Sequence, residues 1–568
     1  MRRMKGAAGL LTALLLAFQL SAQTFALANE DNGIKVVPVN FTHNGYSYEI
    51  EGVAKSTDGD YQMKSPARLA ARKLPSTYDP RSSGEITTVK DQASTGACWA
   101  FSALACAEQD LIKKGLENPS TEFSVPALVL SSNSGTATGK DDFSSGGNWL
   151  FAASALANGQ GLCYEDYEPF LESGTGNMIV SENKKSVSEY RLNYVMELSS
   201  TTQVKRKIME LGAVSASYFA GNGYMNHNNT AYYDPDASKN TIINHSVTVV
   251  GWDDNYSKDN FRYKPANNGA WLVKGSWGAD QDNDGFYWVS YDEAEFGQFC
   301  CYDFEESCDN TYHYSKMTGY VVNASNDGSV YGANVFTAKA DEKLDKAGFM
   351  YVGKTGSADY TLSVYTDVSD SDPIGVLETQ ISGSVSANGF YTVDFPQDIL
   401  LEEGEKYSIS VKFSGDSGRG YLLAESDRTS NAQSGQSYVS LNGKYWSDVG
   451  ADKTDSIGSL FIYAYTDDTA KPDKSSLESA LAKYGTFAGC EREANNARMV
   501  LADENASKND ISNAQKLLIS AAEEQDETLV ITTEAQWESF AKRVSSGESF
   551  EGKLVTLEAD LDFDGKTI

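Results

Sequence analysis

The sequence predicts an α+β domain, followed by an all-β sandwich and a small helical module. After Cys98 the apolar residues follow helical spacing, and the later apolar runs 246–250 and 270–274 are typical of buried strands. From about residue 312 to 466 apolar and polar residues alternate between Gly, Ser and Asp turns, as in Tyr407–Phe413, which indicates a sandwich. From 471 the pattern becomes helical, and Ser507–Asp510 reads as a capping box.

The first 28 residues have the form of a secretory signal peptide. Three basic residues, Arg2, Arg3 and Lys5, precede an apolar core at 9–20 and an A-x-A cleavage site at 26–28. This core is too short to span a membrane, and no later stretch is long and apolar enough. We therefore expect a secreted chain with no membrane span after signal cleavage.

The rest of the chain divides into five expected segments. Polar residues 29–74 are expected to form a short prosegment. The α+β domain is expected at 75–311, the sandwich at 312–467 and the helical module at 471–525. Residues 528–568 read as the start of a further, incomplete, β-rich region.

The composition excludes some classes of function and favours others. The net charge of -32 argues against nucleic-acid binding, which requires a basic surface, and is read as a contribution to solubility. Seven cysteines in 568 residues are too few for a disulfide framework. Their odd number leaves at least one thiol unpaired, which points to a reactive cysteine.

Cys98 and His245 form the candidate catalytic pair. Cys98 opens a predicted helix, where the helix dipole favours a thiolate. Of the four histidines, His43 and His313 lie outside or at the edge of the domain and His227 lies in a predicted loop. His245 begins an apolar strand, which would hold an imidazole more rigidly than a loop.

These residues lie in segments that together resemble the papain family of cysteine peptidases. The matching segments are Gln92, TGACWAF around Cys98, SSGGNW at 144–149, NHSVTVVGW around His245 and WLVKGSWG at 271–278. The resemblance implies a papain-like two-lobed domain, with a helical lobe and a β-barrel-like lobe. It further implies an endopeptidase that cleaves proteins through a thioester and requires no cofactor.

The resemblance also assigns roles to individual residues. Cys98 would be the nucleophile, His245 its general base and acid, and Gln92 a donor to the oxyanion. The implied substrate-binding positions are Gly146, Gly147 and Trp277.

One departure from the family pattern concerns the histidine. The family's orienting asparagine corresponds to Gly275, which has no side chain. Two functions follow as hypotheses: an active cysteine endopeptidase of reduced rate, or a surface adhesin or glycan-binding protein whose peptidase domain is weakened or inactive. If the missing side chain is the only defect, Gly275→Asn should raise turnover.

A second departure lies in the acidic loop after Trp277. Asp280, Asp282 and Asp284 follow a D-x-D-x-D-G pattern that resembles a calcium loop, but the twelfth position is Tyr291 rather than Glu. The loop is therefore read either as a solvated acidic turn or as a site for structural calcium.

The order of the segments resembles clostridial-type cell-surface cysteine peptidases with a lectin-like domain. The helical segment resembles small surface modules of bacterial wall proteins. These resemblances imply a secreted protein at the cell wall or cell surface, whose partners are protein substrates and wall or surface glycans. A structural spacer is the alternative role for the sandwich.

Overall fold

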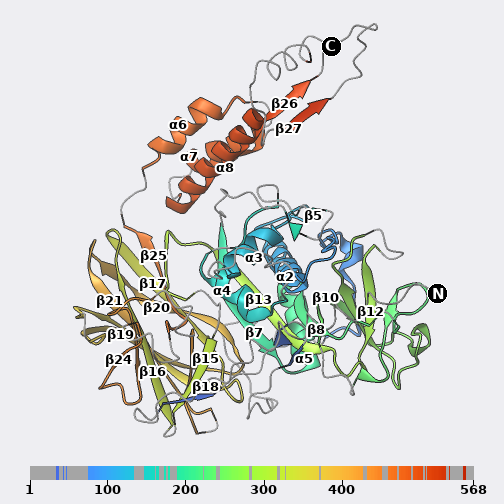
Figure 1. Ribbon diagram of the computed structural model, residues 1–568, viewed down its shortest axis with the longest axis horizontal. Helices are drawn as coiled ribbons and strands as arrows, with labels where there is room; N and C mark the ends of the chain where they lie inside the picture. Colours follow the sequence, from blue (N-terminus) through green and yellow to red (C-terminus); the bar gives the residue numbers. More distant parts are fainter. Residues whose placement is uncertain are drawn as a thin grey trace, which may run out of the picture.

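The computed structural model describes most of the chain from residue 74 onward (Figure 1). The described ranges are 34–37, 42–43, 46–47, 74–133, 146–159, 161–165, 170, 172–173, 177–178, 189–221, 223–237, 243–279, 284–315, 320–325, 328–369, 372–416, 418–425, 432–450, 458–469, 473–487, 490–502, 506, 508–531, 537 and 554–557. The expected signal peptide lies outside these residues.

A buried helix forms the centre of the α+β domain. Helix α2 (Cys98–Lys114) is buried from Trp99 to Leu111. It ends at Gly115, whose φ of 73° allows its N–H to return to the carbonyls of the last turn. The other helices of this domain are α3 (Val125–Asn133), α4 (Trp149–Ala157) and α5 (Thr201–Leu211).

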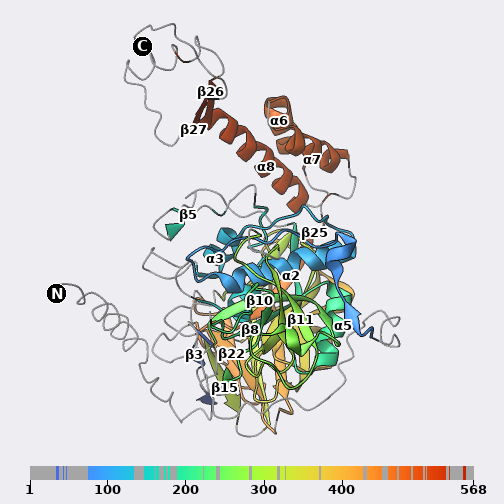
Figure 2. The same cartoon turned by 90° about the vertical axis from the view of Figure 1, so that its right-hand side faces the viewer.

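The second part of this domain is an antiparallel sheet packed against α2. The order of its strands in space is β7-β13-β8-β10-β11-β12. Their bounds are β7 (Tyr190–Leu198), β8 (Val214–Tyr218), β10 (His245–Asp253), β11 (Ala270–Lys274), β12 (Phe286–Ser290) and β13 (Gly297–Glu306). The domain thus has the helical part and the sheet part that the sequence predicts, and Figure 2 shows α2 across the sheet.

The following region is all-β, as predicted. Its six-stranded sheet contains β16 (Ser329–Thr337), β18 (Ala358–Thr366), β19 (Val376–Val385), β21 (Lys406–Ser414), β23 (Ser437–Ser440) and β24 (Ser447–Asp448). Facing strands are β14 (Asn310–Tyr312), β17 (Glu342–Tyr351), β20 (Gly389–Leu401) and β25 (Ile462–Asp468). Alternating residues such as Tyr407, Ile409 and Val411 fill its core.

The two domains share one sheet. Strand β20 of the all-β region pairs with β7 of the α+β domain, with Phe390 opposite Val195. The resulting 12-stranded sheet runs from β14 to β9 (Ala231–Tyr232). A side-chain contact supports the junction: Asn388 donates to Glu197 at 3.1 Å.

Part of the expected prosegment contributes a strand. Strand β1 (Ile34–Val37) pairs antiparallel with β15 (Tyr320–Ser325), which in turn pairs with β22 (Tyr421–Glu425). The short strands β2 (Thr42–His43) and β3 (Tyr46–Ser47) form a hairpin. This segment is therefore paired with the all-β region, and it places His43 in β2.

The C-terminal module comprises α6 (Ser475–Tyr484), α7 (Glu491–Ala502) and α8 (Lys508–Glu527). Its separate apolar core includes Leu477, Ala494 and Leu518, and Ser507 of the expected capping box lies outside the described residues. Strands β26 (Thr528–Ile531) and β27 (Leu554–Leu557) follow as a parallel pair.

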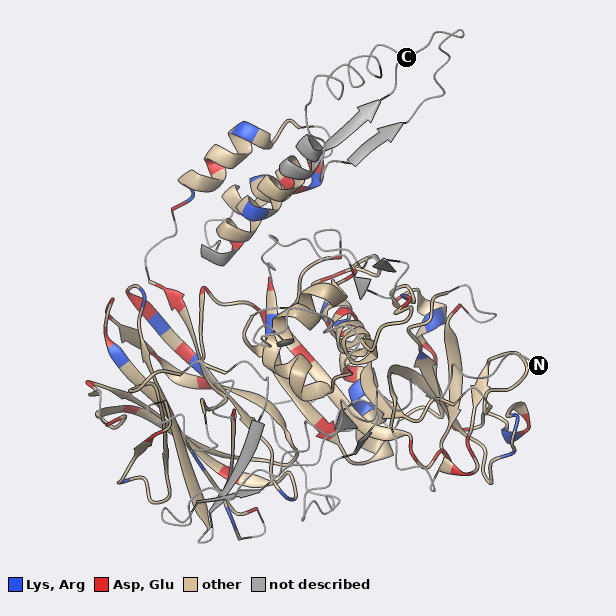
Figure 3. Ribbon diagram, viewed as in Figure 1, with Lys and Arg blue, Asp and Glu red and all other residues tan. Residues whose placement is uncertain are grey.

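Three further observations concern membrane spans, cysteines and charges. Within the described residues, no helix combines the length and apolarity needed to cross a bilayer. All seven cysteines are free thiols. Acidic and basic residues are both distributed along the helical module and the β-rich strands (Figure 3).

Candidate active site

Cys98 is the first residue of α2. Its partly exposed thiol accepts a hydrogen bond from the backbone N–H of Ser246 at 3.4 Å. No side chain caps this helix terminus, because the N-cap residue is Ala97. The terminal N–H groups therefore remain directed towards the region of the thiol, where they favour negative charge.

His245 begins β10, directly before the residue that contacts the thiol. Its ring stacks on Trp277 with centroids 4.4 Å apart and an angle of 7°. Tyr218 meets it in an edge contact at 5.9 Å. His245 is only 5% exposed, and its Nε2 has no hydrogen-bond partner among the described residues. Ring packing, rather than a hydrogen bond at Nε2, holds the imidazole.

Gln92 is held by several hydrogen bonds. Its Oε1 accepts from the Ser276 hydroxyl at 2.6 Å, and its Nε2 donates to the Thr95 carbonyl at 2.9 Å. Its backbone N–H donates to the Ser276 carbonyl at 2.8 Å. Because a primary amide carries two donor hydrogens, Nε2 retains a second one for a substrate oxyanion.

Gly147 lies against the indole of Trp99. A Cβ at this position would be 2.4 Å from the Trp99 ring, so no other residue fits without movement. Gly146 is its neighbour, and Asn148 then caps α4 by accepting from the Leu150 N–H at 2.9 Å. Packing on Trp99 is a second reason for glycine here, besides the substrate contact expected from the resemblance.

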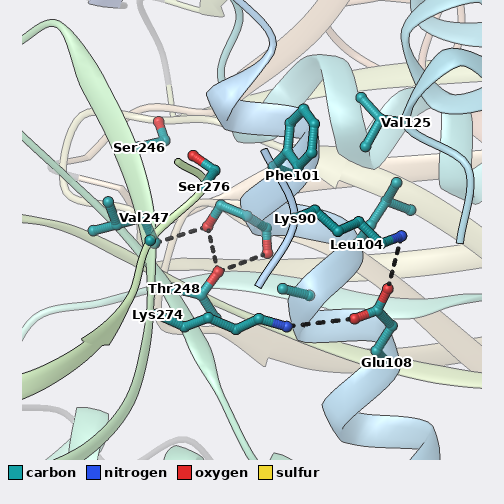
Figure 4. A pocket seen from close by; sticks show the side chains of 13 residues that line it. Lys90, Phe101, Leu104, Glu108, Val125, Ser246, Val247, Thr248, Lys274 and Ser276 are labelled. Carbon is teal, nitrogen blue, oxygen red and sulfur yellow. Dashed lines mark hydrogen bonds and ion pairs between the residues drawn. The ribbon is translucent and has the colours of Figure 1, made fainter. Parts of the chain in front are cut away.

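A buried ionic cluster lines a pocket next to this site (Figure 4). Glu108 of α2 is 3.4 Å from the Lys90 ammonium and 3.7 Å from that of Lys274 on β11. Thr87 bridges the cluster, since it donates to Glu108 at 2.6 Å and accepts from Lys274 at 2.6 Å. The cluster fixes the helix that carries Cys98 to the sheet that carries His245.

Hydroxyl contacts strengthen the same junction. Ser102 of α2 donates to the Val247 carbonyl at 2.8 Å, two residues after His245. Thr248 contacts the Ser102 hydroxyl at 3.3 Å. Figure 4 shows Val247 and Thr248 of this junction on one side of the pocket.

Burial controls the protonation of the pair. It raises the pKa of the Cys98 thiol, although the N–H groups of Ser246 and Trp99 oppose this effect. It lowers the pKa of His245 to about 3. Both directions favour neutral side chains in the substrate-free protein, which is opposite to the charged pair expected from the helix dipole. The thiol makes no direct hydrogen bond to the imidazole within the described residues, and such contacts often tighten only when substrate binds.

The acidic loop after Trp277, read above as a candidate calcium site, is described only at its C-terminal end. Asp284 has a φ of 52° and precedes β12, whereas Asp280 and Asp282 lie outside the described residues. Structural calcium at this loop therefore stays a prediction.

Known protein families match both domains of this structure. A family model described as "Papain family cysteine protease" matches residues 74–323, and one described as "Lectin like domain" matches residues 311–466. This chain has a papain-family cysteine protease domain followed by a lectin-like domain. The papain-family match confirms the cysteine peptidase domain that the sequence predicted.

Two solved structures of one clostridial protein align with most of this chain. The cysteine protease and lectin-like domains of Cwp84, a surface layer associated protein of Clostridium difficile, align with a TM-score of 0.62 and 25% identity, covering 78% of this chain and 100% of that one. Cwp84 after propeptide cleavage aligns with a TM-score of 0.59 and 26% identity, covering 69% and 99%.

Curated relatives include several cathepsins. Bos taurus cathepsin S is 29% identical over 218 residues, which are 38% of this chain and 60% of that protein. Mus musculus cathepsin K is 24% identical over 216 residues, 38% of this chain and 59% of that protein. The chain thus spans about 60% of the length of these cathepsins.

Several contacts of the papain-family site were not predicted from the sequence. The Ser246 N–H, the Ser276 hydroxyl and the Glu108 cluster all depend on pairing between distant segments. Ser276 could have been found, because it lies between Gly275 and Trp277 in a matched segment. In the sequence alone, nothing distinguishes Lys90 and Glu108 from ordinary charged surface residues.

Proposed function

We propose that this protein is a secreted, cell-surface-associated cysteine endopeptidase that cleaves protein substrates. The observation that carries the proposal is the convergence of Cys98, His245 and Gln92 at one junction of α2, β10 and the 276–278 segment. Chain segments about 150 residues apart meet there, with the thiol in contact with the residue after the histidine. A thiol buried only for packing would not require this surrounding.

The chemistry follows from the neutral starting pair. The Cys98 sulfur attacks the peptide carbonyl as its proton passes to the His245 imidazole, and the carbonyl oxygen becomes an oxyanion beside the Gln92 amide. The imidazolium then gives its proton to the leaving amine as the C–N bond breaks. His245 next removes a proton from water, which attacks the thioester and frees Cys98.

The lectin-like domain supports a surface role. Cwp84, which shares both domains, is described as surface layer associated. We propose that this domain binds wall or surface glycans, with Tyr445 as one candidate contact because its side chain is 80% exposed. Its neighbour Trp446 packs against the core formed with Tyr438 and Val335. We also propose that residues 29–74 are removed on maturation, since the related Cwp84 structure follows propeptide cleavage.

Covalent labelling tests the peptidase function. The purified mature chain is treated with a peptidyl epoxide, and an unfolded protein such as denatured casein is offered as substrate. We expect labelling of one thiol at Cys98 and cleavage of the casein, both lost in Cys98→Ala. Cys308→Ala, which removes another partly exposed thiol, should retain both activities.

The same experiment separates the alternative. A folded protein that binds glycan, resists labelling and leaves casein intact would be the adhesin with an inactive peptidase domain. The intact Gln92, Cys98 and His245 argue against this result, and the unpartnered Nε2 of His245 is the feature that argues for it.

A further inference from the structure

The unusual feature of this site is how His245 keeps its orientation. Gly275 offers no side chain to the imidazole, and Nε2 is buried without a partner among the described residues. A general base that accepts and then returns a proton must nevertheless hold one orientation through both transfers. Some other part of the structure must therefore restrain the ring.

The space beside Gly275 is tight for a side chain. A Cβ added there would lie 3.1 Å from the carbonyl oxygen of Gly285 and 3.4 Å from Cε1 of Tyr287. The first distance is tight, and the backbone at Gly285 is held in place because its carbonyl accepts from the Gly275 N–H at 3.0 Å. The remainder of a longer side chain would have to share the space with the Tyr287 ring.

Tyr287 is linked to the histidine through one intermediate residue. Its hydroxyl lies 2.8 Å from that of Tyr218, and the two side chains are 4% and 1% exposed. Tyr218 lies directly opposite His245 in the pairing of β8 with β10. Its ring edge meets the imidazole at an angle of 61°, while Trp277 covers the other side.

We propose that the hydrogen-bonded pair Tyr218–Tyr287 is the positioning element of His245, in place of a side chain at position 275. The proposal rests on the peptidase function proposed above. Tyr218 restrains the imidazole, and Tyr287 fixes the Tyr218 ring by giving its buried hydroxyl the partner that it needs. Neither tyrosine touches the reacting atoms.

The physical reason lies in the burial of both hydroxyl groups. A buried hydroxyl without a partner is unfavourable, so the pair constrains both rings to the orientation in which the oxygens meet. If one hydroxyl is removed, the other ring loses this constraint and can rotate or shift. Because Tyr218 shapes one side of the imidazole site, His245 then samples orientations that do not face Cys98.

Hydroxyl deletions test the proposal. Tyr287→Phe and Tyr218→Phe keep the rings and remove one oxygen each. We expect kcat on a peptide substrate to fall about tenfold with KM within about twofold, because misplacing a catalytic group affects the chemical step. The acid limb of the pH–rate profile, which reports protonation of the His245 base, should shift to higher pH as the released ring becomes less buried. Active-site labelling normalises each rate to the folded fraction.

A matched control removes a third hydroxyl from the same aromatic cluster. Tyr232 packs against Tyr218 at 4.9 Å, but its own hydroxyl donates to the Phe219 carbonyl and is not part of the pair. Tyr232→Phe should leave kcat and the pH profile unchanged. If it lowers kcat as much as Tyr287→Phe does, general packing rather than the pair positions His245, and the proposal fails.

Position 275 supplies an independent test by rescue. Gly275→Asn alone should lower kcat or leave it unchanged, because the added side chain would press on the Gly285 carbonyl and contact Tyr287. Gly275→Asn together with Tyr287→Leu should be faster than Tyr287→Leu alone, since the amide can then enter. A gain from Gly275→Asn in the otherwise unchanged protein would show that the space is open and would overturn the proposal.

Failure of this inference is distinguishable from failure of the proposed function. If the unchanged protein neither labels at Cys98 nor cleaves casein, the peptidase function has failed. If it does both, and the two tyrosine variants match it in kcat and in pH profile, only the positioning role has failed.

Discussion

The two sides of the cleft are stabilised by different interactions. On the helix side, Gln92 has hydrogen bonds to Ser276 and Thr95, and the Cys98 thiol accepts from the backbone of Ser246. On the strand side, the His245 ring packs against the rings of Tyr218 and Trp277. The helix side therefore depends on a few short polar contacts, and the strand side depends on the shapes of large side chains.

This difference shows that the residues of a catalytic motif can be kept while the contacts that hold them in place change. Cys98, Gln92 and His245 lie in segments that resemble the family, whereas the His245 ring packs against Tyr218 and Trp277 and its Nε2 has no partner among the described residues. A site of this kind should respond to polar deletions on one side and to changes of ring shape on the other. The following predictions order these effects by size.

The largest effect on activity is expected at Gln92. Gln92→Ala removes a donor to the oxyanion and should lower kcat by roughly 10²–10³-fold, with a small change in KM. Gln203→Ala is the control, because it removes an amide on α5 that contacts Ser199. Steady-state kinetics on one peptide measure both. Equal rates for Gln92→Ala and the unchanged protein would mean that the backbone alone stabilises the oxyanion.

The buried cluster behind the cleft should dominate stability. Glu108→Gln leaves the ammonium of Lys274 buried without its counter-charge and should lower the free energy of unfolding by about 3–5 kcal/mol. Glu85→Gln is the control: it breaks a contact to Lys113 whose carboxylate is 47% exposed, and should cost less than about 1 kcal/mol. Denaturant unfolding followed by fluorescence compares the two.

The same cluster predicts a pH dependence. Burial acts to raise the pKa of Glu108, but Lys90 and Lys274 outweigh it and hold the pKa below its usual range. The folded state therefore favours the carboxylate, so this contribution to stability is present above about pH 4.3 and is lost as pH falls through the lower folded pKa. Glu108→Gln should lack this acid-dependent loss.

Changes on the strand side should be smaller. Trp277→Ala removes the ring that stacks on His245 and should lower kcat/KM roughly tenfold, whereas Trp277→Phe should keep most of the activity because it keeps a flat ring. Tyr263→Ala removes an aromatic side chain of similar exposure, 41% against 39%, and serves as control. If Trp277→Phe is as slow as Trp277→Ala, the indole acts by something other than stacking.

The last prediction concerns the charges of Cys98 and His245 in the absence of substrate, which alkylation of the thiol can report. Because burial raises the pKa of Cys98 and lowers that of His245 to about 3, neither group is charged at neutral pH. The rate with iodoacetamide should then increase about tenfold per pH unit up to the raised thiol pKa, following the thiolate fraction. A rate that is constant from weakly acidic pH upward would instead indicate a preformed thiolate–imidazolium pair.

Sequence patterns were sufficient for the features that depend on local order. Helical spacing placed the helix after Cys98, an apolar run placed β10 after His245, and period-two alternation placed the sandwich. The matched segments contain Gln92, which contacts Ser276, and Trp277, which stacks on His245. These features rest on the residues next to each position in the chain.

The remaining features depend on contacts that a linear pattern does not contain. The approach of Tyr287 to Tyr218 requires the order β8-β10-β11-β12, and the two residues are 69 positions apart. The neutral state expected for Cys98 and His245 depends on burial, which reverses what the helix dipole alone predicts. Position 275 reads in the sequence as the loss of an orienting side chain, and only the structure shows that a Cβ there would lie 3.1 Å from the Gly285 carbonyl oxygen.

The strand pairing between β7 and β20 determines what happens when the chain is shortened. A peptidase domain cut off after about residue 311 would lose β20 and leave the N–H and C=O groups of Tyr194, Val195 and Met196 without their partners. An exposed strand of this kind invites pairing with other copies and aggregation. We therefore expect the lectin-like domain to shield this edge of the peptidase domain from self-association, so a shortened fragment should stay soluble only if it retains both domains.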